Sequence, residues 1–345
     1  MLKYLLNSSA VAVALAASSA HAQEAGSAAR NDESSLSSEI IVTATRKEMS
    51  TQDVGISVSA FSGDQMREVG ISDSTQIVQI IPGVQIAQAN SGATSSYSIR
   101  GVTQTDYGFS QEAPVALYVD EVYQANQTGA QFQLFDMGRV EVLRGPQGTL
   151  FGRNATGGLV HFITARPKFE NSGYVEGNYG SFNRFKLEGA LNFELSNKAA
   201  VRVSAVGDFH DDIAKNRAGP DLWNRNEYGG RVQVLLEPND DVSVLLNVRG
   251  GKRDNTGTPY AHGVATPTGF GGTGVFDTSP GATDVFGFAE PDSDPYSVAI
   301  DDVSASTADT WGATSTLRWD LGGVTLHSIT DYNEISVLLR EDSDM

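Results

Sequence analysis

Apolar and polar side chains alternate along much of the second half of the chain, which is the period of a β-strand with two unlike faces. Between residues 184 and 195, one face carries Phe185, Leu187, Leu191, Phe193 and Leu195, and the other carries Arg184, Lys186, Glu188, Asn192 and Glu194. The pattern recurs at 201–209, 231–236 and 242–249, and it predicts two later strands near 311–320 and 324–331. Alternation by itself fits either a half-solvated antiparallel sandwich or a transmembrane β-barrel.

The lengths of the connections decide between these two folds. The connections after the second, fourth and sixth strands are tight turns at 196–198, 238–240 and 320–323, whereas those after the first, third and fifth strands lie at 180–183, 211–225 and 251–308. Short turns at one end and mostly longer loops at the other are typical of an outer-membrane barrel. The mean hydropathy of −0.22 agrees with this, because only every second residue of such a strand faces lipid.

The number of strands indicates an incomplete barrel. Only about seven strands fit into residues 169–345. Barrels that enclose a folded domain need about 22 strands, and an open sheet would leave unpaired edges in lipid. We therefore expect residues 169–345 to be the N-terminal part of a transmembrane β-barrel from a longer protein, with an inactive truncated fragment as the alternative.

The first 22 residues have the features of a secretory signal peptide. Lys3 supplies a positive charge, residues 5–17 form a short apolar core, and Ala20-His21-Ala22 fits the cleavage rule, which places the cut between Ala22 and Gln23. The apolar run is shorter than the about 20 residues of a transmembrane helix. The chain is therefore predicted to be exported. The polar residues that follow, up to 38, are predicted to be disordered.

A short β-prone segment lies within the polar tether 23–50. Its residues are Glu39, Ile40, Ile41, Val42, Thr43, Ala44 and Thr45. One interpretation is an ordinary edge strand of the next domain. The other is a tethered strand that adds itself to the sheet of another protein by main-chain hydrogen bonds.

Residues 51–168 are expected to form a small α+β domain. Ser62 can cap a short helix that Gly70 ends, and Ser72 can cap a second helix that ends before Pro82. Strands are predicted at 57–61, 84–87, 97–100, 115–119, 139–144 and 159–164, the last two joined by a glycine-rich loop. That loop lacks the GK[ST] of a P-loop and the glycine spacing of a dinucleotide site, which argues against nucleotide binding.

The order of motifs in this domain resembles the plug domain of TonB-dependent outer-membrane receptors. The motifs are IPGVQI at 81–86, SIRGV at 98–102, VALYVDEVY at 115–123 and RVEVLRGPQG at 139–148. The resemblance covers residues 39–167, and the segment 39–45 resembles the TonB box. It implies an α+β plug domain followed by antiparallel transmembrane β-barrel strands in outer-membrane lipid. It also implies TonB as the partner of residues 39–45.

The implied function is uptake of a scarce ligand, with a ferric siderophore or a similar iron complex as the family default and no cofactor. The alternative is a non-transporting structural or adhesive barrel. By position, three polar loops match the family's ligand-facing apical loops. Their candidate ligand-binding residues are Asn90, Ser91, Asp106, Tyr107, Phe109, Tyr123, Gln124 and Asn126. Polar loops are also ordinary turns, so both interpretations stay open. Arg100 and Arg144 match family arginines that pair with carboxylates of the barrel and dock the plug.

The composition argues against several other functions. The chain has 24 Lys+Arg against 42 Asp+Glu, a net charge of −18, which argues against a nucleic-acid partner, and it has no cysteine. Its five histidines show no pair at zinc-ligand spacing, and no nucleophile motif indicates an enzyme. Residues 254–309 hold nine acids and no Lys or Arg, which fits calcium binding or, as we favour, a solvated acidic loop.

Overall fold

The computed structural model describes residues 41–43, 49–50, 52–71, 74–89, 92–108, 111–125, 134–258, 265–266, 275–276, 294, 296–301 and 305–341. All of them belong to one compact unit, 39–345. The predicted cleavage site at Ala22 and Gln23 lies outside the described residues, as does most of the acidic segment 254–309. In the described ranges, no helix is long and apolar enough to cross a membrane.

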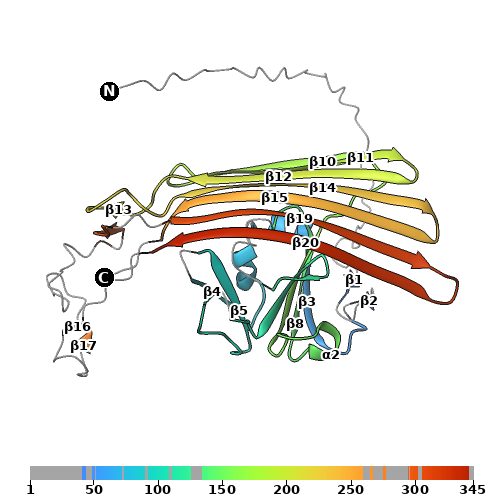
Figure 1. Cartoon of the computed structure of the whole chain (residues 1–345), viewed down its shortest axis with the longest axis horizontal. Helices are drawn as coiled ribbons and strands as arrows, with labels where there is room; N and C mark the ends of the chain where they lie inside the picture. The colour runs from blue at the N-terminus through green and yellow to red at the C-terminus, as the bar shows by residue number, and fades with distance from the viewer. Residues whose placement is uncertain are drawn as a thin grey trace, which may run out of the picture. The chain divides into compact units, whose positions relative to one another are not determined.

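The second half of the chain forms an antiparallel sheet of seven strands, which we call the wall. Its strands are β10 (Ser172–Tyr179), β11 (Phe185–Ser196), β12 (Ala199–His210), β14 (Arg225–Asn239), β15 (Val242–Thr256), β19 (Ala305–Asp320) and β20 (Thr325–Arg340). They lie side by side in that order (Figure 1). The predicted alternating strands are confirmed. The last two are longer than expected, because β19 continues through small polar residues that carry no apolar pattern yet pair with β15 and β20.

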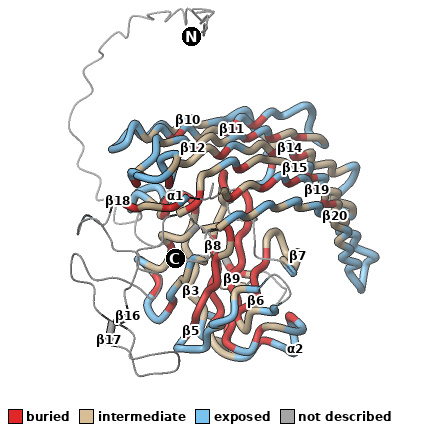
Figure 2. The backbone as a smooth tube through the Cα atoms, turned by 60° about the vertical axis from the view of Figure 1, so that its left-hand side comes forward, coloured by how far each residue is buried: buried red, intermediate tan, exposed pale blue. Residues whose placement is uncertain are grey.

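The two faces of the wall differ as the alternation predicts. Apolar side chains on one face are exposed, among them Phe185 at 46%, Leu191 at 56% and Val248 at 57%. Polar residues at the alternate positions are buried, among them Asn192 at 1% and Arg231 at 2%. Burial therefore alternates along the wall strands (Figure 2). An apolar outer face and a polar inner face is the arrangement of a strand between lipid and a polar lumen.

The connections of the wall also differ between its two ends. The strands on either side of a short connection end and restart at Ser196 and Ala199, at Asn239 and Val242, and at Asp320 and Thr325. At the other end, β13 (Lys215–Asn216) pairs in parallel with β18 (Ser297–Val298) above a small core of Ala214, Leu222, Val298 and Ile300. The remaining pair there is β16 (Ala265–Thr266) with β17 (Val275–Phe276). We call the end of the wall with the three short connections the short-turn end, and the opposite end the long-loop end.

The first half of the chain forms a mixed five-stranded sheet, which with its helices we call the plug. The sheet contains β3 (Ser57–Ser62), β8 (Met137–Arg144), β9 (Gly158–Thr164), β6 (Val115–Val119) and β7 (Val122–Tyr123), in that spatial order. A separate hairpin pairs β4 (Val84–Ala89) with β5 (Thr94–Ile99), and β1 (Ile41–Val42) pairs with β2 (Met49–Ser50). The helices are α1 (Gly63–Glu68), the 3₁₀ helix η1 (Ser74–Gln79) and α2 (Gly148–Phe151).

Both faces of the plug sheet are buried. Val140 and Val142 of β8 belong to one apolar cluster with Ile77 and Phe162, whereas Leu143 belongs to a second cluster with Leu159. The two clusters use alternate residues of the same strand, as its sequence predicts. Apolar packing on both sides fixes the register of β8, because a shift by one residue would exchange its faces.

The local signals in the plug are mostly confirmed. The Ser62 hydroxyl accepts from the Gln65 N–H at 3.1 Å in a capping box, and Gly70 follows α1 with φ of 74°. The expected second helix is a 3₁₀ helix, and its proposed cap Ser72 is not among the described residues. The glycine-rich loop contains α2, which the sequence did not predict. Gly158 after it has φ of 135°, and an added Cβ would lie 2.2 Å from the Leu143 carbonyl oxygen.

Candidate functional site: the coupling strand and the plug–wall contact

The segment predicted to bind TonB is a β-strand in its described part. Ile41 pairs with Ser50 and Val42 with Met49, and the Val42 side chain is buried in the second apolar cluster of the plug. Glu39, Ile40, Ala44 and Thr45 lie outside the described residues. We call residues 41–43 the coupling strand. It is paired with its own chain, in a two-stranded sheet that is separate from the plug sheet, and its TonB-binding role stays a prediction.

A buried carboxylate holds the end of the coupling strand. Glu141 of β8 has no exposed surface, and its carboxylate accepts hydrogen bonds from the Thr43 N–H at 2.9 and 3.1 Å and from the Thr43 hydroxyl at 3.2 Å. Arg139 Nε donates to the same carboxylate at 2.7 Å. A buried charge is tolerated only with such partners. The sequence did not single out Glu141, although an acid on a strand buried on both faces is a usable signal.

His161 connects this carboxylate to the turn between β6 and β7. Its ring is 2% exposed, and its Nδ1 lies 3.9 Å from Glu141 Oε2. Its Nε2 accepts a hydrogen bond from the Glu121 N–H at 3.0 Å, so this nitrogen carries no proton. Asp120 and Glu121 form the turn with φ values of 48° and 67°, a conformation that non-glycine residues seldom adopt. No group of three or more metal-ligating side chains occurs in the described ranges.

The candidate ligand-binding residues lie in different surroundings. Tyr107 is half-buried, and Asp106 is exposed and accepts from the Gly108 N–H at 2.9 Å. The Tyr123 hydroxyl accepts from Asn154 Nδ2 at 2.7 Å, beside the turn that follows α2, whereas Gln124 lines a small cavity together with residues of the wall. The other four, Asn90, Ser91, Phe109 and Asn126, are outside the described residues. The ligand-binding role of all eight stays a prediction.

One contact places the β4–β5 turn. The Gly92 carbonyl accepts from Arg253 Nη1 at 3.3 Å, and Arg253 lies near the long-loop end of β15. Gly92 directly follows the predicted residues Asn90 and Ser91 in the sequence. This contact puts Gly92 near the end of the wall where the long loops emerge.

The two arginines predicted to dock the plug point to other neighbours. Arg144 donates to the hydroxyls of Ser57 at 3.4 Å and Ser59 at 2.9 Å, while Arg100 is exposed with φ of 53°. Within the described part of the chain, neither forms an ion pair with a carboxylate of the wall. The docking role of both arginines stays a prediction.

Several of the contacts that join plug and wall follow one transverse line. Six inward-facing polar residues lie opposite one another across six strands, and we call them the polar row. They are Asn192, Arg202, Gln233, Asn247, Thr314 and Asp331. The first four accept or donate hydrogen bonds to the plug or to the linker after it, so the row is where the plug rests on the wall.

Each of these four residues has a defined partner. Asn192 bonds to the backbone of Lys168 and Glu170 in the linker. Arg202 donates from Nε and Nη2 to the two carboxylate oxygens of Asp136 at 2.8 and 2.6 Å. Gln233 Nε2 donates to Thr164 Oγ1 at 3.1 Å, and Asn247 Nδ2 donates to Asp120 Oδ2 at 3.5 Å. The sequence did not single out these pairs.

The residues around Asp136 strengthen one end of this contact. The Asp136 N–H donates to Glu188 Oε1 at 2.8 Å, and the Tyr174 hydroxyl donates to the same oxygen at 2.8 Å. The neighbouring Phe135 carbonyl accepts from Arg231 Nη1 at 3.0 Å, with the guanidinium 4.6 Å from the Phe135 ring centre. Side chains from both the plug and the wall thus form one buried cluster.

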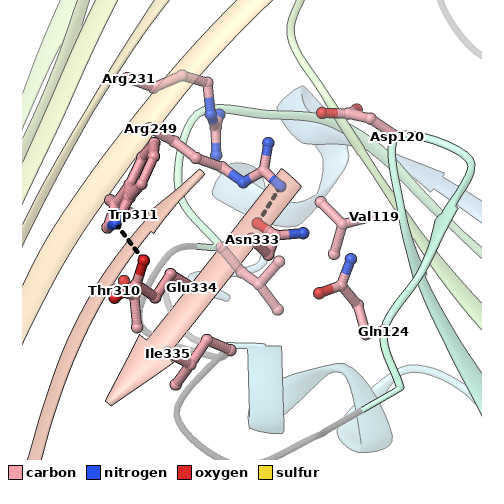
Figure 3. A pocket seen from close by; sticks show the side chains of 11 residues that line it. Val119, Asp120, Gln124, Arg231, Arg249, Thr310, Trp311, Asn333, Glu334 and Ile335 are labelled. Carbon is pink, nitrogen blue, oxygen red and sulfur yellow. Dashed lines mark hydrogen bonds between the residues drawn. The ribbon is translucent and has the colours of Figure 1, made fainter. Parts of the chain in front are cut away.

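Cavities lie between plug and wall in the described part of the chain. A large one of about 1240 Å³ is lined by Thr43, Glu121, Leu245, Thr316 and His327, among others. A small one of about 20 Å³ is lined by Asp120, Gln124, Arg249, Trp311 and Glu334, among others (Figure 3). The large cavity reaches the coupling strand, and the wall residues that line it lie toward the short-turn end.

Comparisons with known proteins agree with this geometry. The family model for the TonB-dependent receptor plug domain matches residues 50–159. The pesticin receptor of Yersinia pestis is 30% identical over 216 residues, which is 61% of this chain and 31% of the relative. The ferripyoverdine receptor of Pseudomonas aeruginosa is 26% identical over 180 residues, 52% of this chain and 22% of the relative.

The fold is shared with solved receptors. The ferric yersiniabactin uptake receptor of Yersinia pestis superimposes with a TM-score of 0.69 at 22% identity, covering 84% of this chain and 42% of that receptor. An antiparallel sheet that holds a plug against its polar face is the architecture of a plugged outer-membrane barrel. Residues 50–159 match the plug domain of TonB-dependent receptors, and the chain as a whole is similar in sequence and fold to receptors of this kind. These relatives are receptors and transporters rather than enzymes. The chain spans about a third of the length of the first curated relatives that it matches.

Proposed function

We propose that this chain supplies the plug and the first wall strands of a receptor that takes up a ferric siderophore with energy delivered by TonB. The observation that carries the proposal is the coupling strand, which ends at Thr43 on a buried carboxylate of the plug and borders the large cavity. A force applied to this strand acts on β8, the strand that is continuous with Asp136 and its wall contact.

The iron ligand is supported by the names of the relatives. Similar proteins include the ferripyoverdine receptor and the ferric yersiniabactin uptake receptor. A vitamin B12 transporter of Vibrio vulnificus is also similar, at 27% identity over 217 residues. The candidate loop residues, among them Tyr107, Tyr123 and Gln124, offer the aromatic and amide groups that suit a large, partly polar organic ligand.

The coupling strand fits a partner that recognises backbone rather than side chains. Residues 39–45 are rich in β-branched side chains and follow a polar tether. Once separated from Met49 and Ser50, such a strand can pair with an edge strand of TonB through main-chain hydrogen bonds. Uptake then needs no covalent chemistry, because the work is mechanical.

Growth under iron limitation tests the proposal. A strain without the gene should fail to grow when ferric yersiniabactin or ferripyoverdine is the sole iron source, and the intact gene should restore growth on at least one of them. Dependence on cyanocobalamin supply would move the ligand to vitamin B12. Growth that is independent of the gene in all three media would contradict the uptake function and favour a structural or adhesive barrel.

A further inference from the structure

The contacts along the polar row weaken from β12 to β15. Arg202 and Asp136 form a bidentate charged pair whose side chains are 9% and 1% exposed. Gln233 and Thr164 share one neutral hydrogen bond of 3.1 Å. The single contact of Asn247 with Asp120 is 3.5 Å long, at the limit of a hydrogen bond. Bidentate charged pairs are the strongest of these and long single contacts the weakest.

Beyond Asn247, the row is joined to the wall itself. Arg249 Nη1 donates to the Thr314 hydroxyl at 2.7 Å, and Arg249 Nη2 donates to Asp331 Oδ1 at 2.9 Å. In the described structure these hydrogen bonds connect β15, β19 and β20 to one another. The plug is therefore held at one side of the row, on β12 and β14, and only lightly at the other.

The two cavities lie on opposite sides of the row at its loosely held part. On β19, Thr316 lines the large cavity on the short-turn side of Thr314, and Trp311 lines the small cavity on the long-loop side. On β20, His327 and Glu334 flank Asp331 in the same way. The row thus lies between the wall residues that line the small cavity and those that line the large one.

The turn of Asp120 and Glu121 closes the space between them. Asp120 lines the small cavity, and Glu121 lines the large one. Besides the contact with Asn247, the turn meets the wall where Glu121 Oε2 lies 4.0 Å from His327 Nδ1. Both turn residues have positive φ, a strained conformation that persists only where surrounding contacts enforce it. Loss of these wall contacts would remove part of the constraint that keeps Asp120 and Glu121 at positive φ.

We infer that the plug swings on the Asp136–Arg202 and Thr164–Gln233 contacts and opens at the turn of Asp120 and Glu121. The opening joins the two cavities into a route along the inner faces of β15, β19 and β20. This inference rests on the proposed uptake function and specifies the path that the ligand takes between plug and wall. Arg249, Asp331, Thr316 and His327 would line the route, so it suits a hydrophilic ligand that exchanges hydrogen bonds with both donors and acceptors.

Paired cysteines test which side moves, since the chain has no cysteine of its own. One double variant, Glu121→Cys with His327→Cys, locks the opening side. The matched control, Thr164→Cys with Gln233→Cys, locks the hinge side. Both pairs are oxidised in cells, and uptake is measured with radioactive iron carried by the chelate on which the wild type grows. Each measurement is repeated after reduction.

The opening-side lock should lower uptake to the level of a strain without TonB, and reduction should restore it, while the hinge-side lock leaves uptake close to wild type. Equal loss with both locks would show that the plug leaves as a whole and would overturn the hinge. Normal uptake with the opening side locked would overturn the route. Absence of uptake by the wild type would instead contradict the proposed function.

A second measurement needs no disulfide. Single variants Asn247→Cys and Gln233→Cys are exposed to a maleimide with and without TonB while the chelate is supplied. Labelling at position 247 should become faster when TonB is present, and labelling at 233 should not change. Equal acceleration at both positions, or at neither, would overturn the inference even if a cysteine pair failed to fold.

Discussion

Replacing Asp136 with Asn tests how strongly the plug is docked. The substitution keeps the size of the side chain but removes the charge that accepts two hydrogen bonds from Arg202. Because the two side chains are only 1% and 9% exposed, Arg202 would keep a buried charge without its counterion. Breaking a buried pair in this way costs about 3–5 kcal/mol. At 1.4 kcal/mol for each factor of ten, the detached plug should become roughly a hundredfold more populated, or more.

Limited proteolysis of the receptor purified in detergent measures that population, because only a detached plug exposes its backbone to the protease. The matched control is Lys168→Gln, which breaks an exposed pair with Glu170 at 3.7 Å and should change stability by less than about 1 kcal/mol. The double variant Asp136→Asn with Arg202→Met should recover part of the loss, since no charge then remains buried and asparagine tolerates the positive φ of 51° at position 136. Equal cleavage of the Asp136→Asn variant and the control would refute the anchoring role.

Three further outcomes are expected. Val42→Pro should stop uptake while ligand still binds at the cell surface, because proline lacks the N–H that a strand donates in pairing with TonB. Normal uptake by this variant would contradict the proposed pairing of residues 39–45 with TonB. Glu141→Gln should weaken the hydrogen bonds to Thr43 and speed the labelling of a cysteine placed at position 43. Unchanged labelling would argue against Glu141 as the residue that holds the coupling strand. Gly158→Ala should lower the free energy of unfolding by about 1–3 kcal/mol, which is measured as a lower thermal midpoint. Gly148→Ala should be tolerated, because nothing lies within 4 Å of an added Cβ there.

Local sequence patterns predicted the elements of this protein well. Two-residue periodicity identified the wall strands and their outer face, because a strand between lipid and a polar lumen must alternate. Ser62 and Gly70 marked the ends of α1, because capping and left-handed residues act over a few positions. The β-branched segment containing Ile41 and Val42 was also visible in the sequence, and its described part is a strand.

The tertiary structure alone decided how these elements meet. Thr43 and Glu141 are 98 positions apart, and Asn247 and Asp120 are 127 positions apart, so no local pattern links them. The polar row depends on the lateral register of six strands, which the turns and the packing set together. A sequence shows that Arg202 or Gln233 faces inward, but only the assembled sheet places them on one line with the plug. Burial gives those contacts their energetic weight, because a polar group that is removed from water costs free energy unless it forms a hydrogen bond within the protein.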